Sequence, residues 1–163
     1  MVYVDTDFAG CRRTRRSTSG GLIMIGQHPL RHWATTQPTI ALSSGEAELV
    51  GIVRGATQAL GFQSMARDLG FDISLHLRTD ATAAIGICRR RGLGKIRHLD
   101  VSDLWIQDKL RAGAFQLSKV AGQENVADVL TKHVDCSTLQ RLLPHMGLEE
   151  ETGRADTAPN LQH

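Results

Sequence analysis

The sequence predicts a single α/β domain, in which a five-stranded mixed sheet is flanked by helices. Three observations lead to this fold class. Three short apolar segments separated by turn-forming residues precede one long helical pattern, which predicts an antiparallel three-strand meander. After that helix, strand and helix patterns alternate, which favours parallel strands joined by helical crossovers. The chain has 163 residues, the length of one ordinary domain that can bury a substantial core.

The meander is predicted from the first 36 residues. Residues 1–8 alternate with a period of two, placing Val2, Val4 and Phe8 on one face and Tyr3, Asp5 and Asp7 on the other. A turn over residues 17–21 leads to a second strand at 22–25, and a turn over 26–29 leads to a third strand at 30–36.

A long helix is predicted to begin at Ser43 or Ser44 and to end at Gly70. Ser43 and Glu46 have the spacing of a capping box, and apolar residues recur at helical intervals behind them. Gly51 and Gly55 lie on one stripe of this helix, which favours a close approach to the sheet. The elements after it are predicted as a strand at 73–80, helices at 83–88 and 101–111, a strand at 115–120, and a last helix at 125–132 that resumes at 139–143.

Composition restricts the possible class of protein. With 41% hydrophobic and 22% charged residues, and no apolar run long enough to span a bilayer, the chain is expected to be a soluble domain without membrane contact. No signal peptide follows Met1, so we expect an intracellular protein. The cysteines, at positions 11, 88 and 136, are odd in number and widely spaced, and therefore support neither a disulfide framework nor a zinc site.

The net charge of +2 conceals a segregation along the chain. Residues 149–163 have a net charge of −3 and are predicted to form a disordered acidic tail, which leaves +5 for a compact domain at 1–148. Basic residues cluster in two short stretches, at 12–16 and 89–97. Such clusters suit a nucleic-acid phosphate backbone, although two solvated basic loops are the simpler alternative.

Four carboxylates fall at the ends of predicted elements: Asp5, Glu48, Asp80 and Asp128. If the first and fourth strands are neighbours, Asp5 and Asp80 stand side by side. Carboxylates gathered in one place repel one another unless cations neutralise them, and oxygen ligands are those that Mg²⁺ prefers. Two such ions can support phosphoryl displacement, so a basic domain with this cluster fits a nuclease. Helix capping and solvated charge are the alternative explanations.

The sequence motifs around these carboxylates form a specific pattern. YVDTDFAG, ALSSGEAELVGI, RTDATAAIGI and ENVADVLTKH occur in this order, and RRSTSGG, TQPTIALSSGEAE and KIRHLD accompany them. Together they resemble the ribonuclease H domain of copia-type retrotransposon Pol polyproteins, from about Val2 to His133. The resemblance implies a ribonuclease H-like fold.

The resemblance also implies an activity: an endoribonuclease that cuts the RNA strand of RNA/DNA hybrids and leaves 5′-phosphate ends. Two Mg²⁺ ions are implied, with Mn²⁺ as a substitute. Asp5 would bridge both ions, Asp80 would ligate the ion that holds the attacking water, and Glu48 and Asp128 would complete the shells. The implied partners are the hybrid duplex and an upstream reverse transcriptase domain of the same polyprotein. An isolated domain is expected to be a monomer, located in the cytoplasm, in virus-like particles or in the nucleus.

The chain departs from the family pattern at two places. The loop from Lys119 to Asn125 lacks the histidine that many ribonucleases H have, and Ala81-Thr82 follow Asp80 where a glutamine is frequent. The residues expected to contact nucleic acid are Arg12, Arg13, Arg15, Arg16, Ser43, Ser44, Thr82, Arg89, Arg90, Arg91, Lys95, Arg97 and His98. Two other functions remain open: an inactive duplex-binding copy of the fold, and a DNA nuclease of the integrase or transposase type.

Overall fold

The computed structural model describes residues 1–92, 94, 101–151 and 153. The elements follow in the order β1 (Val2–Asp7), β2 (Thr18–Ile25), β3 (His28–Thr36), α1 (Ser44–Asp68), β4 (His76–Thr79), α2 (Thr82–Arg89), α3 (Val101–Arg111), β5 (Gln116–Lys119), the 3₁₀ helices η1 (Gly122–Glu124) and η2 (Val126–Leu130), α4 (Cys136–Leu142) and the 3₁₀ helix η3 (Leu143–Met146).

The five strands form one mixed sheet in the order β3-β2-β1-β4-β5. β1 pairs antiparallel with β2, and β2 pairs antiparallel with β3, so the predicted meander is confirmed. β4 lies parallel to β1 with Val2 opposite Leu77, and β5 lies parallel to β4. The predicted fold class is therefore confirmed. Because β1 and β4 are parallel, their carboxyl-terminal ends lie side by side at the same end of the sheet.

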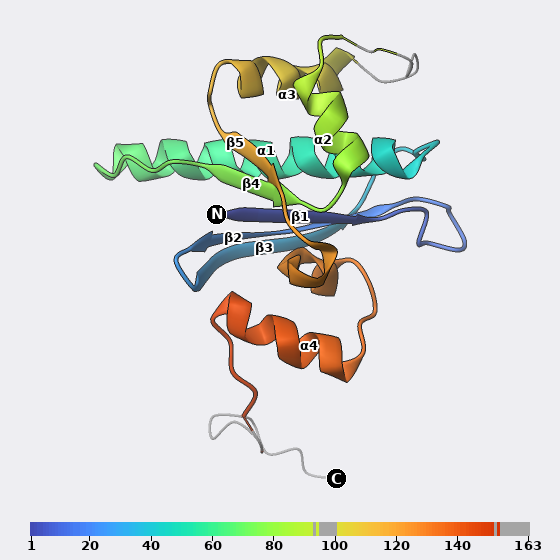
Figure 1. Ribbon diagram of the computed structural model, residues 1–163, viewed down its shortest axis with the longest axis vertical. Coiled ribbons are helices and arrows are strands. Elements are labelled where there is room, and N and C mark those ends of the chain that lie inside the picture. Colours follow the sequence, from blue (N-terminus) through green and yellow to red (C-terminus); the bar gives the residue numbers. More distant parts are fainter. Residues whose placement is uncertain (93, 95–100, 152, 154–163) are drawn as a thin grey trace.

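Helices cover both faces of the sheet (Figure 1). α1, α2 and α3 lie on one face, while η2 and α4 lie on the other. The larger core lies under α1 and contains Val4, Leu49, Ile52, Leu77 and Ile106, all of them almost completely buried. The smaller core, on the η2 face, contains Leu22, Met24, Val126, Leu142 and Met146. β1 is thus buried on both faces, which explains why its polar residues Asp5 and Thr6 are also buried.

α1 approaches the sheet through its glycine stripe, as the sequence predicts. A Cβ atom on Gly51 would lie 2.4 Å from Oγ1 of Thr6, and one on Gly55 would lie 2.4 Å from Cγ1 of Val4. Both distances are far below van der Waals contact, so only glycine permits this separation between α1 and β1. The close approach brings the first turns of α1 down to the end of β1.

Several predicted boundaries are wrong. Phe8 does not continue the apolar face of β1: the strand ends at Asp7, the chain turns at Ala9 with φ of 54°, and Phe8 is 42% exposed. β2 begins at Thr18, within the predicted turn, because residues 18–21 pair with both β1 and β3. The predicted α-helix at 125–132 is the shorter 3₁₀ helix η2, since Asn125 caps it at one end and Thr131 ends it.

The capping box at α1 differs from the expected form. Oγ of Ser43 accepts a hydrogen bond from the backbone N–H of Glu46, as predicted. The carboxylate of Glu46, however, accepts from the backbone N–H of Leu42 at 2.7 Å rather than from Ser43. The two bonds still satisfy backbone donors at the start of the helix, so α1 begins where the sequence predicts.

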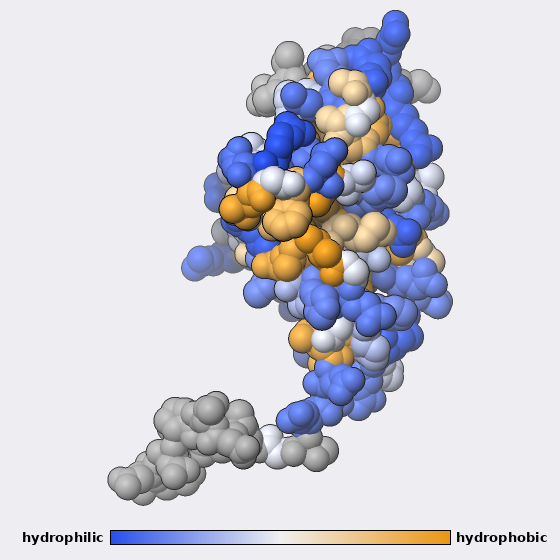
Figure 2. Space-filling view, turned by 90° about the vertical axis from the view of Figure 1, so that its left-hand side faces the viewer, coloured by the Kyte–Doolittle hydropathy of each residue, from blue (hydrophilic) through white to orange (hydrophobic). Residues whose placement is uncertain are grey.

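The surface of the described part is mixed in character. Figure 2 shows an area of apolar side chains on the face that corresponds to the left of Figure 1, surrounded by polar residues. The β2–β3 turn and the end of α1 lie on this side of the molecule. Exposed apolar residues there include Ile25 and Leu30 beside the turn, and Met65, Leu69 and Phe71 where α1 ends. Among the described helices, none is long and apolar enough to cross a membrane.

Candidate functional site

Three of the four predicted carboxylates meet at one edge of the sheet. Asp5 lies near the end of β1, Glu48 in the first turns of α1, and Asp80 directly after β4. One oxygen from each carboxylate lies within 4.8 Å of the other two. Within the described ranges this is the one group of acidic, histidine or cysteine side chains close enough to share a metal ion. Asp5 is 1% exposed, so its negative charge is almost completely removed from water.

The local structure fixes the position of each carboxylate. β1 and β4 run parallel, so their carboxyl ends place Asp5 and Asp80 at the same edge. The buried amide of Gln37, just after β3, donates to the backbone carbonyl of Ala47 and to Oγ of Ser19, each at 2.8 Å. These bonds tie the first turn of α1 to β2, and they therefore hold Glu48 over the end of β1.

The electrostatics of this group favour a cation. Burial, followed by the neighbouring charges of Asp5 and Asp80, raises the pKa of Glu48 from 4.5 to about 8. Oε2 of Glu48 is buried and has no hydrogen-bond partner among the described residues. A buried oxygen without a donor, beside two further carboxylates, matches the all-oxygen ligand set of a hard divalent ion such as Mg²⁺. The residues present therefore fit a divalent metal.

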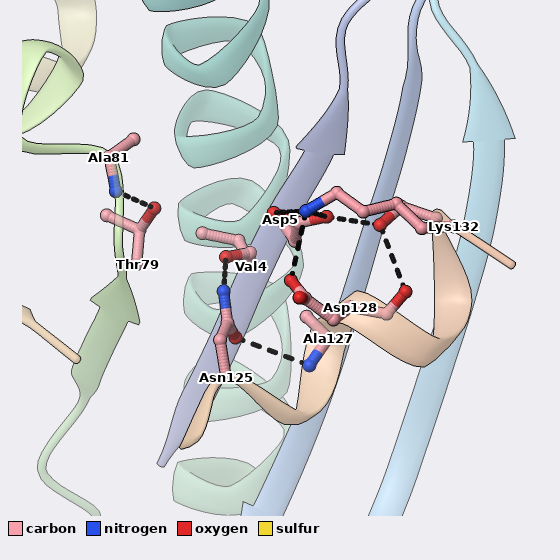
Figure 3. A network of polar contacts seen from close by, with 9 residues as sticks. Val4, Asp5, Thr79, Ala81, Asn125, Ala127, Asp128 and Lys132 are labelled. Carbon is pink, nitrogen blue, oxygen red and sulfur yellow. Dashed lines mark hydrogen bonds and ion pairs between the residues drawn. The ribbon is translucent and has the colours of Figure 1, made fainter. Parts of the chain in front are cut away.

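Asp128 lies on the other side of Asp5 and is not within the three-carboxylate group. It is linked to Asp5 through Lys132, whose Nζ donates to the carboxylates of both residues at 3.2 Å (Figure 3). Burial and then the charge of Asp5 raise the pKa of Asp128 from 3.8 to about 6, against the opposing effect of Lys132. Burial lowers the pKa of Lys132, but the two carboxylates outweigh it, and the pKa is raised.

η2 is attached firmly to the sheet beside Asp5. The side chain of Asn125 donates to the carbonyl of Val4 at 3.0 Å and accepts from the N–H of Ala127 (Figure 3). Oγ1 of Thr131 donates to Oδ2 of Asp5. A Cβ on Gly20, which pairs with Asp5 across the β1–β2 ladder, would lie 2.6 Å from Cγ2 of Thr131. Glycine at this position allows η2 to approach the sheet closely enough for these contacts.

The predicted nucleic-acid residues are mostly exposed. Arg12, Arg13, Arg15 and Arg16 all lie exposed in the loop between β1 and β2. Ser43, Ser44 and Thr82 are exposed at the starts of α1 and α2. Arg89 and Arg91 are exposed and Arg90 is half-buried, while Nη2 of Arg89 donates to the carbonyl of Leu117 at 2.9 Å. Lys95, Arg97, His98 and most of the predicted acidic tail lie outside the described residues.

Sequence reasoning assigned no role to Asn125, Thr131 or Lys132. All three lie within the motif ENVADVLTKH, so the sequence signal is present, but the motif by itself points only to Asp128 for a role in the site.

The loop that lacks a histidine also approaches the site, since a Cβ on Gly122 would lie 3.1 Å from Oδ2 of Asp80. Asp7 stands apart from the group, with its carboxylate against Gly10 in the turn after β1.

Comparison with known proteins identifies sequence relatives of this chain. No family model matches the chain. The chain is 24% identical over 150 residues, or 90% of its length, to the retrovirus-related Pol polyprotein from transposon RE1 of Arabidopsis thaliana. It is 26% identical over 134 residues, or 81% of its length, to the corresponding polyprotein from transposon TNT 1-94 of Nicotiana tabacum. The chain spans about a tenth of the length of these relatives.

Solved structures identify the fold. LC11-RNase H1, crystallised in complex with an RNA/DNA hybrid, matches with a TM-score of 0.54 and 14% identity over 80% of this chain and 91% of that one. The N-terminal RNase H domain of Rv2228c from Mycobacterium tuberculosis matches with a TM-score of 0.53 and 19% identity over 80% of this chain and 88% of that one. The chain therefore has the ribonuclease H fold, and its sequence is similar to one segment of retrovirus-related transposon Pol polyproteins.

Proposed function

We propose that this chain is a metal-dependent endoribonuclease that hydrolyses the RNA strand of RNA/DNA hybrids during retrotransposon reverse transcription. One observation carries the proposal: Asp5 in β1, Glu48 in α1 and Asp80 directly after β4 each place a carboxylate oxygen within 4.8 Å of the other two. The ribonuclease H fold and the homology to transposon Pol polyproteins support the choice of substrate.

The proposed mechanism uses two Mg²⁺ ions, for which Mn²⁺ would substitute. Asp5, Glu48 and Asp80 would hold one ion, and Asp5 with Asp128 would hold the other. When bound, the ions would activate the attacking water and stabilise the departing oxygen, leaving a 5′-phosphate on the product. Thr131 holds one oxygen of Asp5 in a fixed orientation, and the burial of Asp5 excludes bulk water from its side of the site.

Substrate binding is assigned to the basic surface beside the site. The arginines of the β1–β2 loop lie in the loop that follows the strand carrying Asp5. They are exposed and do not belong to either hydrophobic core. Exposed guanidinium groups bind phosphates by charge neutralisation and by bidentate hydrogen bonds. The hydroxyl groups of Ser44 and Thr82, exposed at the starts of α1 and α2, are proposed to contact the sugar-phosphate backbone.

The proposed partner, besides the hybrid, is a reverse transcriptase domain upstream in the same polyprotein. The support is that the relatives are Pol polyproteins about ten times longer than the matched segment. We propose that the domain is monomeric when isolated and acts inside the cell, where reverse transcription takes place.

The test is cleavage of a labelled hybrid in the presence of Mg²⁺ by the wild-type protein and by Asp80→Asn. We expect the wild type to cut the RNA strand, and Asp80→Asn to lose at least about 100-fold in rate because a negatively charged ligand of the reacting ions is replaced by a neutral amide. Asp68→Asn, which removes an exposed carboxylate at the end of α1, is the matched control and should cut as the wild type does.

Other outcomes would identify the two alternative functions. Tight hybrid binding without metal-dependent cleavage would indicate an inactive copy of the fold. Strand transfer on duplex DNA, without cleavage of the hybrid, would indicate an enzyme of the integrase type. Equal cutting by the wild type and Asp80→Asn would contradict the proposed site.

A further inference from the structure

Lys132 joins two carboxylates that the proposed mechanism assigns to metal binding. Its Nζ lies 3.2 Å from Asp5 and 3.2 Å from Asp128, whereas Glu48 and Asp80 receive no such contact from it. The four acidic residues are therefore not equivalent. On one side of Asp5 the negative charge is already balanced by an ammonium group, and on the other side Oε2 of Glu48 is buried without a hydrogen-bond partner among the described residues.

A divalent cation shared by Asp5 and Asp128 would compete with the ammonium group of Lys132 for the same position between the two carboxylates. Both are positive charges attracted by the same two carboxylates, and they cannot both remain in contact with them without strong repulsion. Lysine suits reversible contact, because it is a compact charge on a flexible four-carbon stem. Its side chain is 40% exposed, compared with 1% for Asp5, so it can turn into solvent while the carboxylates stay in place.

We propose that Lys132 is an internal counter-ion that balances Asp5 and Asp128 in the metal-free protein and weakens the binding of the second divalent cation. This inference rests on the proposed function. The cation held by Asp5, Glu48 and Asp80 binds first, because the ammonium contacts only one of its three ligands, whereas it contacts both ligands of the second cation. The second, shared by Asp5 and Asp128, binds only as Lys132 leaves. Lys132 is thus a residue that sets metal affinity, not a catalytic residue.

A simpler structural explanation has a different consequence. If Lys132 serves only to fix η2 through its pair with Asp128, its removal lowers the stability of the protein but leaves the affinity for metal unchanged. If it is a counter-ion, its removal tightens the second cation. Metal affinity therefore separates the two explanations, and it can be measured without any activity assay.

The experiment is a Mn²⁺ titration of metal-free protein, with unbound Mn²⁺ followed by electron paramagnetic resonance. For the wild type we expect one tighter and one weaker ion. In Lys132→Met the weaker ion should bind at least about tenfold more tightly, since an opposing charge has been removed. Lys132→Arg keeps the charge and should resemble the wild type. Lys109→Met removes a lysine that lies over the ring of Trp105, in α3, and should also resemble the wild type.

A second measurement uses the wild-type sequence and does not depend on whether Lys132→Met folds. Lysine side chains are labelled with ¹³C at Cε, and the signal of Lys132 is identified by its loss in Lys132→Arg. During a Mg²⁺ titration this signal should shift most at the weaker binding step, at which Lys132 leaves both carboxylates. A signal that stays unchanged up to saturation of both ions would overturn the inference.

The outcomes distinguish this inference from the proposed function. Two ions bound by the wild type, with the second no tighter in Lys132→Met, overturn the counter-ion role alone. Binding that is the same in the wild type and in Asp5→Asn shows that no ion uses this site, and overturns both. Two ions in the wild type and a tightened second ion in Lys132→Met support both.

Discussion

The side-chain amide of Asn125 donates a hydrogen bond of 3.0 Å to the backbone carbonyl of Val4, 121 positions earlier in the sequence. Val4 immediately precedes Asp5, and Asn125 is three residues before Asp128, so this bond helps to set the distance between two of the four carboxylates. Both partners are completely buried, and no water competes for the bond. The amide of Asn125 is therefore one of the contacts that hold η2 on the sheet, together with the bond from Thr131 to Asp5.

Replacing Asn125 by alanine should impair both stability and cleavage. The carbonyl of Val4 loses its buried donor, which costs about 1–3 kcal/mol of folding free energy. The loosened η2 displaces Asp128, and cleavage of the hybrid should fall about 10- to 100-fold. Thermal unfolding and initial cleavage rates, measured where the variant is folded, test this.

The matched control for this variant is Gln63→Ala. Gln63 donates a similar bond, of 2.7 Å, to the carbonyl of Ile73, but in the second half of α1 and away from the site. It should lose stability without losing activity. Wild-type cleavage by folded Asn125→Ala would show that the bond does not position Asp128.

The glycines of α1 give a second prediction. Gly51→Ala and Gly55→Ala would each place a Cβ 2.4 Å from an atom of β1, and each should destabilise the protein by about 1–3 kcal/mol despite the higher helix propensity of alanine. Gly61 lies in the same helix, and a Cβ there would meet none of the described atoms within 4 Å, so Gly61→Ala should stabilise by up to about 1 kcal/mol. Urea denaturation of the three variants measures this; equal effects at all three positions would refute the close-packing explanation.

The antiparallel meander and the extent of α1 could be predicted from the sequence because their signals are repeated. Leu49, Ile52 and Ala56 recur along a helix of 25 residues, and each repeat supports the same period. The carboxyl ends of parallel strands meet at one edge, so the neighbouring positions of Asp5 and Asp80 follow once β1 and β4 are paired. Long periodic segments and strand direction are thus accessible without coordinates.

Short segments are less predictable because distant contacts decide them. The stretch around Asp128 has a helical pattern, yet it forms 3₁₀ helix η2, fixed by Asn125 on β1 and by Thr131 on Asp5. Neither contact has a local signal. Lys132 has the pattern of a solvated surface lysine, and its role becomes visible only when the fold places Asp5 beside Asp128.

The loop between β1 and β2 gives a third prediction, about binding. Asp80→Asn protein that also carries Arg12→Ala and Arg13→Ala should bind the hybrid more weakly than Asp80→Asn alone. For this variant, the slope of log affinity against log salt concentration should be less steep by about 1 for each lost phosphate contact. Fluorescence anisotropy at several salt concentrations measures both. Arg67→Ala, an exposed arginine in the last turn of α1, is the control, and an equal loss there would contradict a specific role for the loop.

The raised pKa of Glu48 predicts how the stability of the metal-free protein changes with pH. The unfolded chain releases the proton of this carboxyl near pH 4.5, whereas burial and the charges of Asp5 and Asp80 keep it bound in the folded state up to about pH 8. Between these values the folded state binds more protons, so stability falls as the pH rises. Asp128, whose pKa is raised from 3.8 to about 6, adds to the fall at the lower end.

Glu48→Gln removes the ionisation of Glu48 and leaves that of Asp128. In a chelating buffer the variant and the wild type should therefore unfold at similar temperatures near pH 4.5, and the variant should be more stable by at least about 4 °C at about pH 8.5. Differential scanning calorimetry across this range measures the difference. Glu124→Gln makes the same chemical change at an exposed carboxyl in η1, and its difference from the wild type should not grow with pH. A Glu48→Gln curve parallel to that of the wild type would show that Glu48 is already ionised in the folded, metal-free protein.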